Sequence, residues 1–148
     1  PELQDRRMTE IHLYQHRVSA EEIDELGHAG NVEFVKWLQY AAVDHSAALG
    51  WPASRYRELG AGWVVRSHRI TYLKPAYEGD RLEVRTWVAD MRTASSLRKY
   101  DIRKVGGGLI AVAETDWAFI DYASERPLRI PAEVRADFPI ADVPHRTD

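Results

Sequence analysis

The residues from 24 to 49 read DELGHAGNVEFVKWLQYAAVDHSAAL, and they carry the clearest pattern in the chain. Apolar or small side chains recur there at intervals of three or four residues, as one face of an α-helix requires. The recurring residues are Val35, Leu38, Ala42, Ser46 and Leu49, and Phe34, Trp37 and Ala41 widen the stripe. Asn31 is a good N-cap type where the pattern begins, and Gly50 and Pro52 close it. The stretch therefore predicts one long helix whose apolar face another layer must cover.

A carboxylate precedes this helix at a short distance along the chain. Asp24 lies seven residues before Asn31, and Gly27 between them lets the chain turn sharply. Unpaired backbone N–H groups at a helix N-terminus stabilise negative charge nearby. The segment is thus a candidate site for chemistry in which negative charge develops.

Length, composition and charge set the limits of the fold and of the function. The 148 residues suit a single domain spanning 1–148, with 45% hydrophobic and 29% charged residues. The net charge of -3 argues against bulk attraction to nucleic acid or to an anionic membrane. There is no cysteine, which excludes disulfides, thiol catalysis and thiolate metal sites. No stretch resembles a membrane span or a signal peptide, so we expect a soluble cytoplasmic protein.

Beyond the helix the apolar pattern changes to a period of two, which is typical of half-buried strands. We expect strands over 10–18, 63–73, 81–88, 95–105 and 109–122, and short helical segments over 54–59 and 131–138. Turn-forming residues at 77–80 and 106–108 join neighbouring strands, and such short connections indicate antiparallel pairs. The order predicts an α+β domain in which a five-stranded antiparallel sheet covers one helix.

Several motifs, taken in order, resemble those of the acyl-CoA thioesterases of the 4-hydroxybenzoyl-CoA thioesterase type. That family often carries Asp, two further residues and Gly-His-Val-Asn-Asn before its helix, and residues 24–31 here read Asp-Glu-Leu-Gly-His-Ala-Gly-Asn. Further likenesses are Ile70–Pro75 ahead of Gly79-Asp80, Thr115–Trp117, Arg126-Pro127 and Ile130-Pro131. The chain departs from the pattern at Ala29, at Gly30 and at Glu22, where aspartate is common. The resemblance covers roughly residues 10–134 and implies the hotdog fold, a long helix wrapped by a five-stranded antiparallel sheet.

The resemblance also implies roles for four residues. Asp24 would be the catalytic carboxylate, either as general base on water or as nucleophile. The backbone N–H of Asn31 would polarise the thioester carbonyl, and Gly27 would supply the turn between them. His28 would orient substrate or water, although a loop histidine bonded to backbone explains it equally well.

The implied function is hydrolysis of an acyl-CoA thioester to a free carboxylate and CoA. No metal or redox cofactor is implied, and the resemblance implies that the chain forms a homodimer or a homotetramer. The same fold also hosts proteins without catalysis. Two alternatives therefore remain: a non-catalytic domain that binds an acyl thioester or small ligand, and a thioesterase acting on acyl-carrier protein.

Other residues whose side chains could take part in catalysis or binding are explained more simply by structural roles. We expect Glu22 and Glu25 to be surface acids, and His45 to be packed or exposed without catalysis. His12 and His16 lie in a predicted strand, about 13 Å apart, which is too far for one metal ion. The tryptophans at 37, 63, 87 and 117 suit the core or an interface better than an acyl pocket. Candidates for contacts with CoA phosphates are Lys74, Arg92, Arg98, Lys99, Arg103 and Lys104, each more simply explained as a solvated charge.

Overall fold

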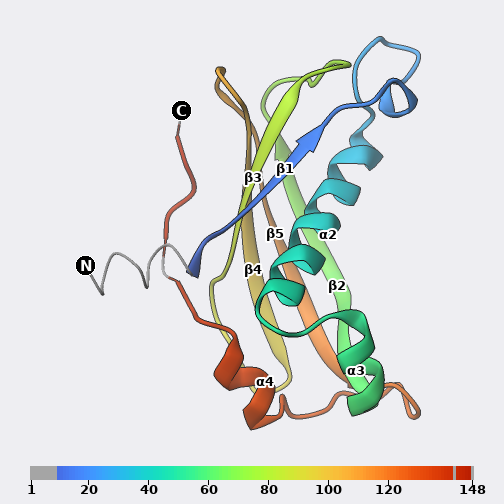
Figure 1. Cartoon of the computed structure of the whole chain (residues 1–148), viewed down its shortest axis with the longest axis vertical. Helices are drawn as coiled ribbons and strands as arrows, with labels where there is room; N and C mark the ends of the chain where they lie inside the picture. Colours follow the sequence, from blue (N-terminus) through green and yellow to red (C-terminus); the bar gives the residue numbers. More distant parts are fainter. Residues whose placement is uncertain (1–9, 142, 148) are drawn as a thin grey trace.

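The computed structural model describes residues 10–141 and 143–147. One sheet of five strands carries the long helix α2 on one of its faces (Figure 1), as expected for an α+β domain. The strands are β1 (His12–Arg17), β2 (Ala61–Tyr72), β3 (Arg81–Val88), β4 (Ser95–Lys104) and β5 (Leu109–Asp121). The helices are η1 (Ala20–Glu22), α2 (Asn31–Ala48), α3 (Ala53–Leu59) and α4 (Ala132–Asp137). Helix η1, a single 3₁₀ turn, is the one element of these that the sequence patterns do not predict.

The sheet has the order β1-β3-β4-β5-β2, and every neighbouring pair is antiparallel. Strands β3, β4 and β5 follow one another through short turns, which is why they lie side by side. The chain leaves β1 at one edge, crosses the sheet face as α2, and returns as β2 at the other edge (Figure 1). The long crossover places α2 over the middle of the sheet.

Helix α2 packs on the sheet through an aromatic and apolar stripe. Trp37, Leu38 and Ala41 are fully buried, and they belong to one core cluster with Leu82 and Tyr100 of the sheet. Burying one large apolar side chain contributes about 1.5–3 kcal/mol, so this face anchors the helix firmly. Of the predicted stripe, Phe34, Trp37, Leu38, Ala41 and Ala42 are buried, whereas Val35, Ser46 and Leu49 are only half-buried.

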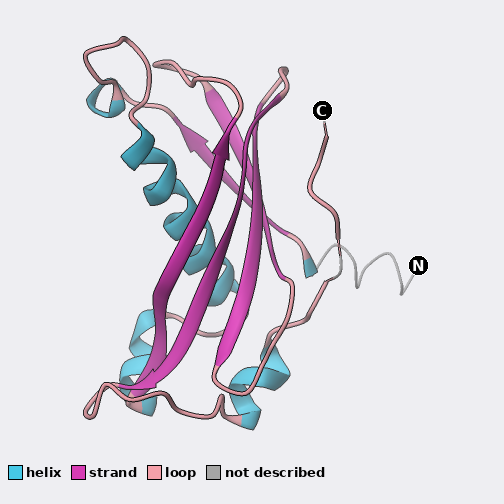
Figure 2. Cartoon of the chain, turned by 180° about the vertical axis from the view of Figure 1, so that it is seen from behind, coloured by secondary structure: helices cyan, strands magenta, loops and turns pink. Residues whose placement is uncertain are grey.

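A second core cluster lies at the end of the sheet that is near the C-terminus of α2. Its buried members are Trp51, Tyr56, Ala61, Val88, Phe119, Ile130, Val134 and Phe138. These residues bring the short helices α3 and α4 against the same end of the strands (Figure 2). None of the helices in the described part of the chain is long and apolar enough to cross a membrane.

Candidate functional site

Asp24 stands in a short closed loop between η1 and α2. Ile23 and Ala29 form an antiparallel bridge at the base of the loop. Inside it the Asp24 N–H donates to the His28 carbonyl (2.9 Å), and the Gly27 N–H donates to the Asp24 carbonyl (3.1 Å). Gly27 has a φ of +87°, a conformation that other residues adopt only with strain. The loop geometry therefore depends on glycine at position 27.

The carboxylate of Asp24 lies beside the start of α2. Its Oδ1 accepts a hydrogen bond from the Leu26 N–H (2.8 Å). Its Oδ2 lies 3.8 Å from where a Cβ on Gly30 would stand, and 3.9 Å from Nδ1 of His28. The side chain is 37% exposed. A water molecule or an incoming carbonyl can thus reach this carboxylate next to the helix N-terminus.

The two residues that precede α2 are fixed to the rest of the fold through backbone hydrogen bonds. The Ala29 N–H donates to the Ala76 carbonyl (2.8 Å), and the Gly30 N–H donates to the Glu22 carbonyl (3.2 Å). Gly30, not Asn31, is the N-cap residue, so that expectation is wrong by one position. Asn31 is instead the first helical residue, whose N–H has no acceptor within the helix. The helix begins at Asn31 as expected, but the extended backbone angles that mark the cap belong to the residue before it, Gly30.

His28 takes the position of a loop histidine held by backbone. Its Nδ1 lies 3.2 Å from the Ala29 carbonyl oxygen, to which a protonated Nδ1 donates. The side chain is about one-third exposed on the same side of the loop as Asp24. The structure thus places Asp24, Gly27, His28 and Asn31 within one loop and helix start.

Glu22 is not the surface acid that the sequence suggested. Its carboxylate accepts hydrogen bonds from Trp37 Nε1 (2.6 Å) and from the Ser19 N–H (2.9 Å), and it lies 2.9 Å from His16 Nε2. Burial raises the pKa of Glu22, but the hydrogen bonds from Ser19, Trp37 and His16 outweigh it, so that the pKa lies below its usual value. Glu22 therefore fastens β1, η1 and α2 together directly behind the Asp24 loop.

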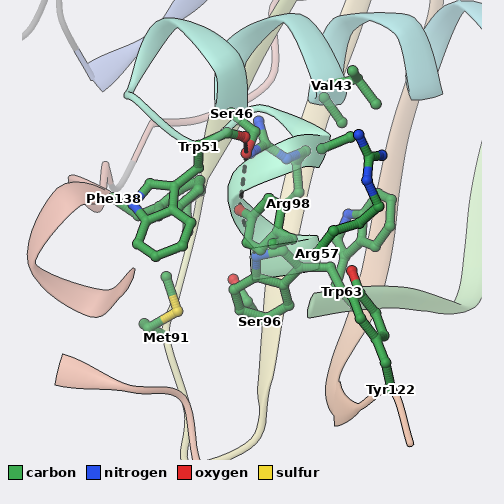
Figure 3. A pocket seen from close by; sticks show the side chains of 15 residues that line it. Val43, Ser46, Trp51, Arg57, Trp63, Met91, Ser96, Arg98, Tyr122 and Phe138 are labelled. Carbon is green, nitrogen blue, oxygen red and sulfur yellow. Dashed lines mark hydrogen bonds between the residues drawn. The ribbon is translucent and has the colours of Figure 1, made fainter. Parts of the chain in front are cut away.

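A cavity of about 270 Å³ lies at the other end of α2 and does not include Asp24. It opens between α2, α3 and the ends of the strands, and Figure 3 shows the side chains around it. Ala42 on its wall stands about three turns beyond Asn31, or about 16 Å along the helix axis. Within one chain the candidate catalytic carboxylate and this cavity are thus well separated.

The tryptophans divide between the core and this cavity. Trp37 and Trp87 are fully buried in the core, as expected. Trp63 and Trp117 line the cavity together with Trp51. The period-two pattern correctly assigns Trp63 and Trp117 to strands. It does not show that a cavity lies beside them.

The basic residues proposed for CoA phosphates also divide. Arg98 is only 5% exposed, so its interpretation as a solvated charge is wrong. Its side chain points from β4 toward α2, where Nη1 contacts His45 Nδ1 (2.8 Å). Three of the others have acidic partners: Arg92 with Asp90 and Asp116, Arg103 with Glu83, and Lys104 with Asp80. Pairing of this kind leaves them less available to a phosphate than a free surface cation would be.

His12 and His16 have different partners. His12 Nε2 contacts Asp44 Oδ2 (2.6 Å), and His16 Nε2 contacts Glu22 Oε1 (2.9 Å). No cluster of three or more metal-ligating side chains occurs among residues 10–141 and 143–147.

Comparison with known proteins identifies the family. Residues 18–138 match the thioesterase-like superfamily. The chain is also similar to the Bacillus subtilis (strain 168) protein named "Putative acyl-CoA thioesterase YneP". The two are 24% identical over 108 residues, which cover 73% of this chain and 78% of the relative.

Solved structures share the architecture. A hypothetical protein from Thermus thermophilus, TT1821, aligns with a TM-score of 0.80 and 26% identity, covering 86% of this chain and 96% of the other. Slr0204, a 1,4-dihydroxy-2-naphthoyl-CoA thioesterase from Synechocystis, aligns with a TM-score of 0.80 and 19% identity, covering 92% and 99%. The second likeness shows the fold alone. The family match covers most of the chain, and the chain therefore belongs to the thioesterase-like superfamily and is a thioester hydrolase with the hotdog fold.

Proposed function

We propose that this protein hydrolyses an acyl-CoA thioester to a free carboxylate and CoA, in the manner of the 4-hydroxybenzoyl-CoA thioesterase type. The observation that carries the proposal is the position of Asp24 Oδ2 against Gly30, the N-cap of α2. A base and a set of unpaired backbone donors at one solvent-open place are what attack on a carbonyl requires. The similarity to an acyl-CoA thioesterase supports CoA as the carrier.

The chemistry uses Asp24 in one of two ways. As a general base, its carboxylate takes a proton from water while the oxygen attacks the thioester carbonyl carbon. As a nucleophile, it attacks that carbon itself and forms a mixed anhydride, which water then hydrolyses. In both routes the carbon–sulfur bond breaks, the CoA sulfur takes up a proton, and one water molecule is consumed.

The start of α2 stabilises the charge that develops on the carbonyl oxygen. The N–H of Asn31 is directed out of the first helical turn and lies at the positive end of the helix dipole. One such donor is typically worth about 10²–10³ in rate. His28, one-third exposed on the same loop, would position the thioester or the water.

A second copy of the chain belongs to this proposal. Strand β2 stands at the edge of the sheet, and its outer backbone groups are not paired within the described part of the chain. A long edge strand of this kind pairs readily with another strand. We propose that two copies join at β2 into a homodimer, alone or within a homotetramer.

The test is release of free thiol from a panel of short aliphatic, long aliphatic and aromatic acyl-CoA thioesters. Wild type should turn over at least one of them, and Asp24→Asn should lose at least about 10²-fold in kcat, since it has no base and no nucleophile. Glu25→Gln, which removes the exposed neighbouring acid, is the matched control and should keep wild-type turnover.

Other results would change the proposal in different ways. Turnover that survives Asp24→Asn would retain the hydrolase and remove Asp24 from its mechanism. Absence of turnover on every CoA ester would direct the assay to acyl-carrier protein as substrate. Absence of turnover there too would favour the ligand-binding domain without catalysis.

A further inference from the structure

The cavity at the C-terminal end of α2 has two cations and no acid on its wall. Arg98 and Arg57 line it, and none of its lining residues is an aspartate or a glutamate. The rest of the wall is mostly apolar and aromatic, with Trp51 and Trp63 among its members (Figure 3). Trp117 also lines it. This local excess of positive charge occurs in a chain whose net charge is -3. The wall therefore suits a ligand that combines an anionic group with an apolar body.

Arg98 is a buried cation without an anionic partner. Its Nη1 donates to His45 Nδ1 (2.8 Å) and to Thr86 Oγ1 (3.1 Å), and both of these acceptors are neutral. His45 is neutral because burial, reinforced by Arg98 and His12, lowers the pKa of its imidazole to about 3. No carboxylate of the described residues pairs with Arg98, whose guanidinium carries five N–H donors. A buried cation without a counter-charge is costly, so an anion would be stabilised beside it.

The two serine hydroxyls on the cavity wall already have partners. Ser46 Oγ donates to the Trp51 carbonyl (2.7 Å), and Ser96 Oγ donates to the Asp90 carbonyl (2.7 Å). The indole N–H of Trp117 faces the hydroxyl of the buried Tyr100, which does not line the cavity. The cationic donors left for a ligand are thus the Arg57 guanidinium, for which no hydrogen bond to another described residue is found, and the N–H groups of Arg98 that do not contact His45 or Thr86.

We propose that this cavity binds a small organic acid, with its carboxylate on the Arg98 guanidinium and its apolar body among the tryptophans. A guanidinium can hold a carboxylate through two parallel hydrogen bonds, which gives both affinity and orientation. The cavity wall does not include Asp24, and its residue Ala42 stands about 16 Å along α2 from Asn31, where the helix begins. Binding there requires no thioester hydrolysis, so the proposal stands independently of the proposed function.

The experiment is isothermal titration of the full chain with two acids and their neutral counterparts. Hexanoate and benzoate supply a carboxylate on an aliphatic and on an aromatic body, and hexanamide and benzamide have nearly the same shapes without the charge. Wild type should bind at least one acid and should bind the matching amide at least about tenfold more weakly, as expected for loss of a charge-assisted hydrogen bond.

Arg98→Met tests the cation, since it keeps an unbranched side chain in the same space. It should weaken binding of the acid at least about tenfold. Asp24→Asn should bind the acid as wild type does, which separates this site from the proposed catalytic carboxylate. A wild type that binds neither acid, an amide that binds as well as its acid, or an Arg98→Met variant that binds normally would overturn the proposal.

A second pair of variants tests the cavity without touching Arg98, in case Arg98→Met does not fold. Ala53 is the exposed first residue of α3, follows a proline N-cap and lines the cavity. Ala132 is the exposed first residue of α4 and also follows a proline N-cap, but it does not line the cavity. Ala53→Phe should abolish binding of the acid and Ala132→Phe should leave it unchanged. Equal binding by the two variants would overturn the proposed location.

Discussion

His45 shows how one buried residue ties α2 to the sheet. The side chain is 1% exposed, and its ring stacks on that of His12 with 4.9 Å between the centroids. Its Nδ1 accepts from Arg98, which places the ring proton on Nε2, a nitrogen without a partner among the described residues. The fold therefore favours the neutral form of His45, because a protonated imidazole would place a second positive charge beside Arg98.

This arrangement predicts a loss of stability in acid. Burial and the nearby Arg98 cation lower the pKa of His45 to about 3 in the folded protein, while an unfolded histidine titrates near about 6.5. Between these values the unfolded chain binds one more proton than the folded one, so stability falls as the pH is lowered through this window. The slope for one proton is about 1.4 kcal/mol per pH unit.

His45→Gln should reduce that slope, because the amide oxygen still accepts from Arg98 but does not titrate. The measurement is the free energy of unfolding in urea from pH 7 to pH 4 for wild type and variant. His28→Gln, which removes a partly exposed histidine, is the control. Parallel pH profiles for wild type and His45→Gln would show that His45 does not bind a proton on unfolding in this range.

The contacts of Glu22 show which interactions cannot be predicted from local sequence patterns. Its partners Ser19 and His16 are close in sequence, but Trp37 is fifteen residues away on the next helix. The Arg98–His45 contact spans 53 positions. Neither pair has a local signature, because each depends on where α2 rests on the sheet. The Asp24 site differs, since all of its residues lie within one short segment with a recognisable spacing.

At the scale of elements, two glycine substitutions should distinguish the effect of the loop from Asp24 to Gly30 on activity from a general effect on stability. Gly27→Ala places a side chain at a φ of +87°, which costs about 1 kcal/mol or more and shifts the loop that carries Asp24. Gly60→Ala imposes the same strain at a φ of +78°, at the C-cap of α3 and at the opposite end of α2. Nothing lies within 4 Å of a Cβ built on either glycine, so the two substitutions differ in place and not in crowding.

Both variants should therefore unfold at similarly lower urea concentrations, while only Gly27→Ala should lose acyl-CoA turnover. The comparison needs urea denaturation and thiol release on the same preparations. An equal loss of turnover in the two variants would mean that general stability, and not the Asp24 loop, limits the rate.

Most element boundaries follow from the sequence because period and turn signals coincide. The pattern predicts strands over 81–88 and 109–122, and the structure has Arg81–Val88 and Leu109–Asp121. Gly106, with a φ of +77°, lies in the turn expected between the last two strands. The cavity could not be predicted in this way, since its wall combines α2, α3, four strand segments and Phe138 from distant parts of the chain.

For the whole molecule, several apolar side chains are exposed on the elements that the proposed pairing at β2 concerns. Val32 and Val43 on α2 are 68% and 61% exposed, and Val64 and Tyr72 on β2 are 37% and 41% exposed. Helix α2 and the edge strand β2 thus both present apolar side chains to solvent. Where exposed apolar side chains form a contiguous surface, that surface commonly marks an interface.

If two copies pair at β2, the mass in solution should be a multiple of 17.0 kDa, and a charge on β2 should lower it. Val64→Lys places a cation in each copy of the joined strands, where like charges repel and must lose hydration. Val105→Lys is the matched control, because Val105 is 51% exposed in the turn between β4 and β5. Size-exclusion chromatography with light scattering over a concentration series measures both. A lower mass for Val64→Lys, with an unchanged mass for Val105→Lys, would support pairing at β2. Equal masses for both variants and wild type would place the interface elsewhere, and a monomeric wild type would remove it.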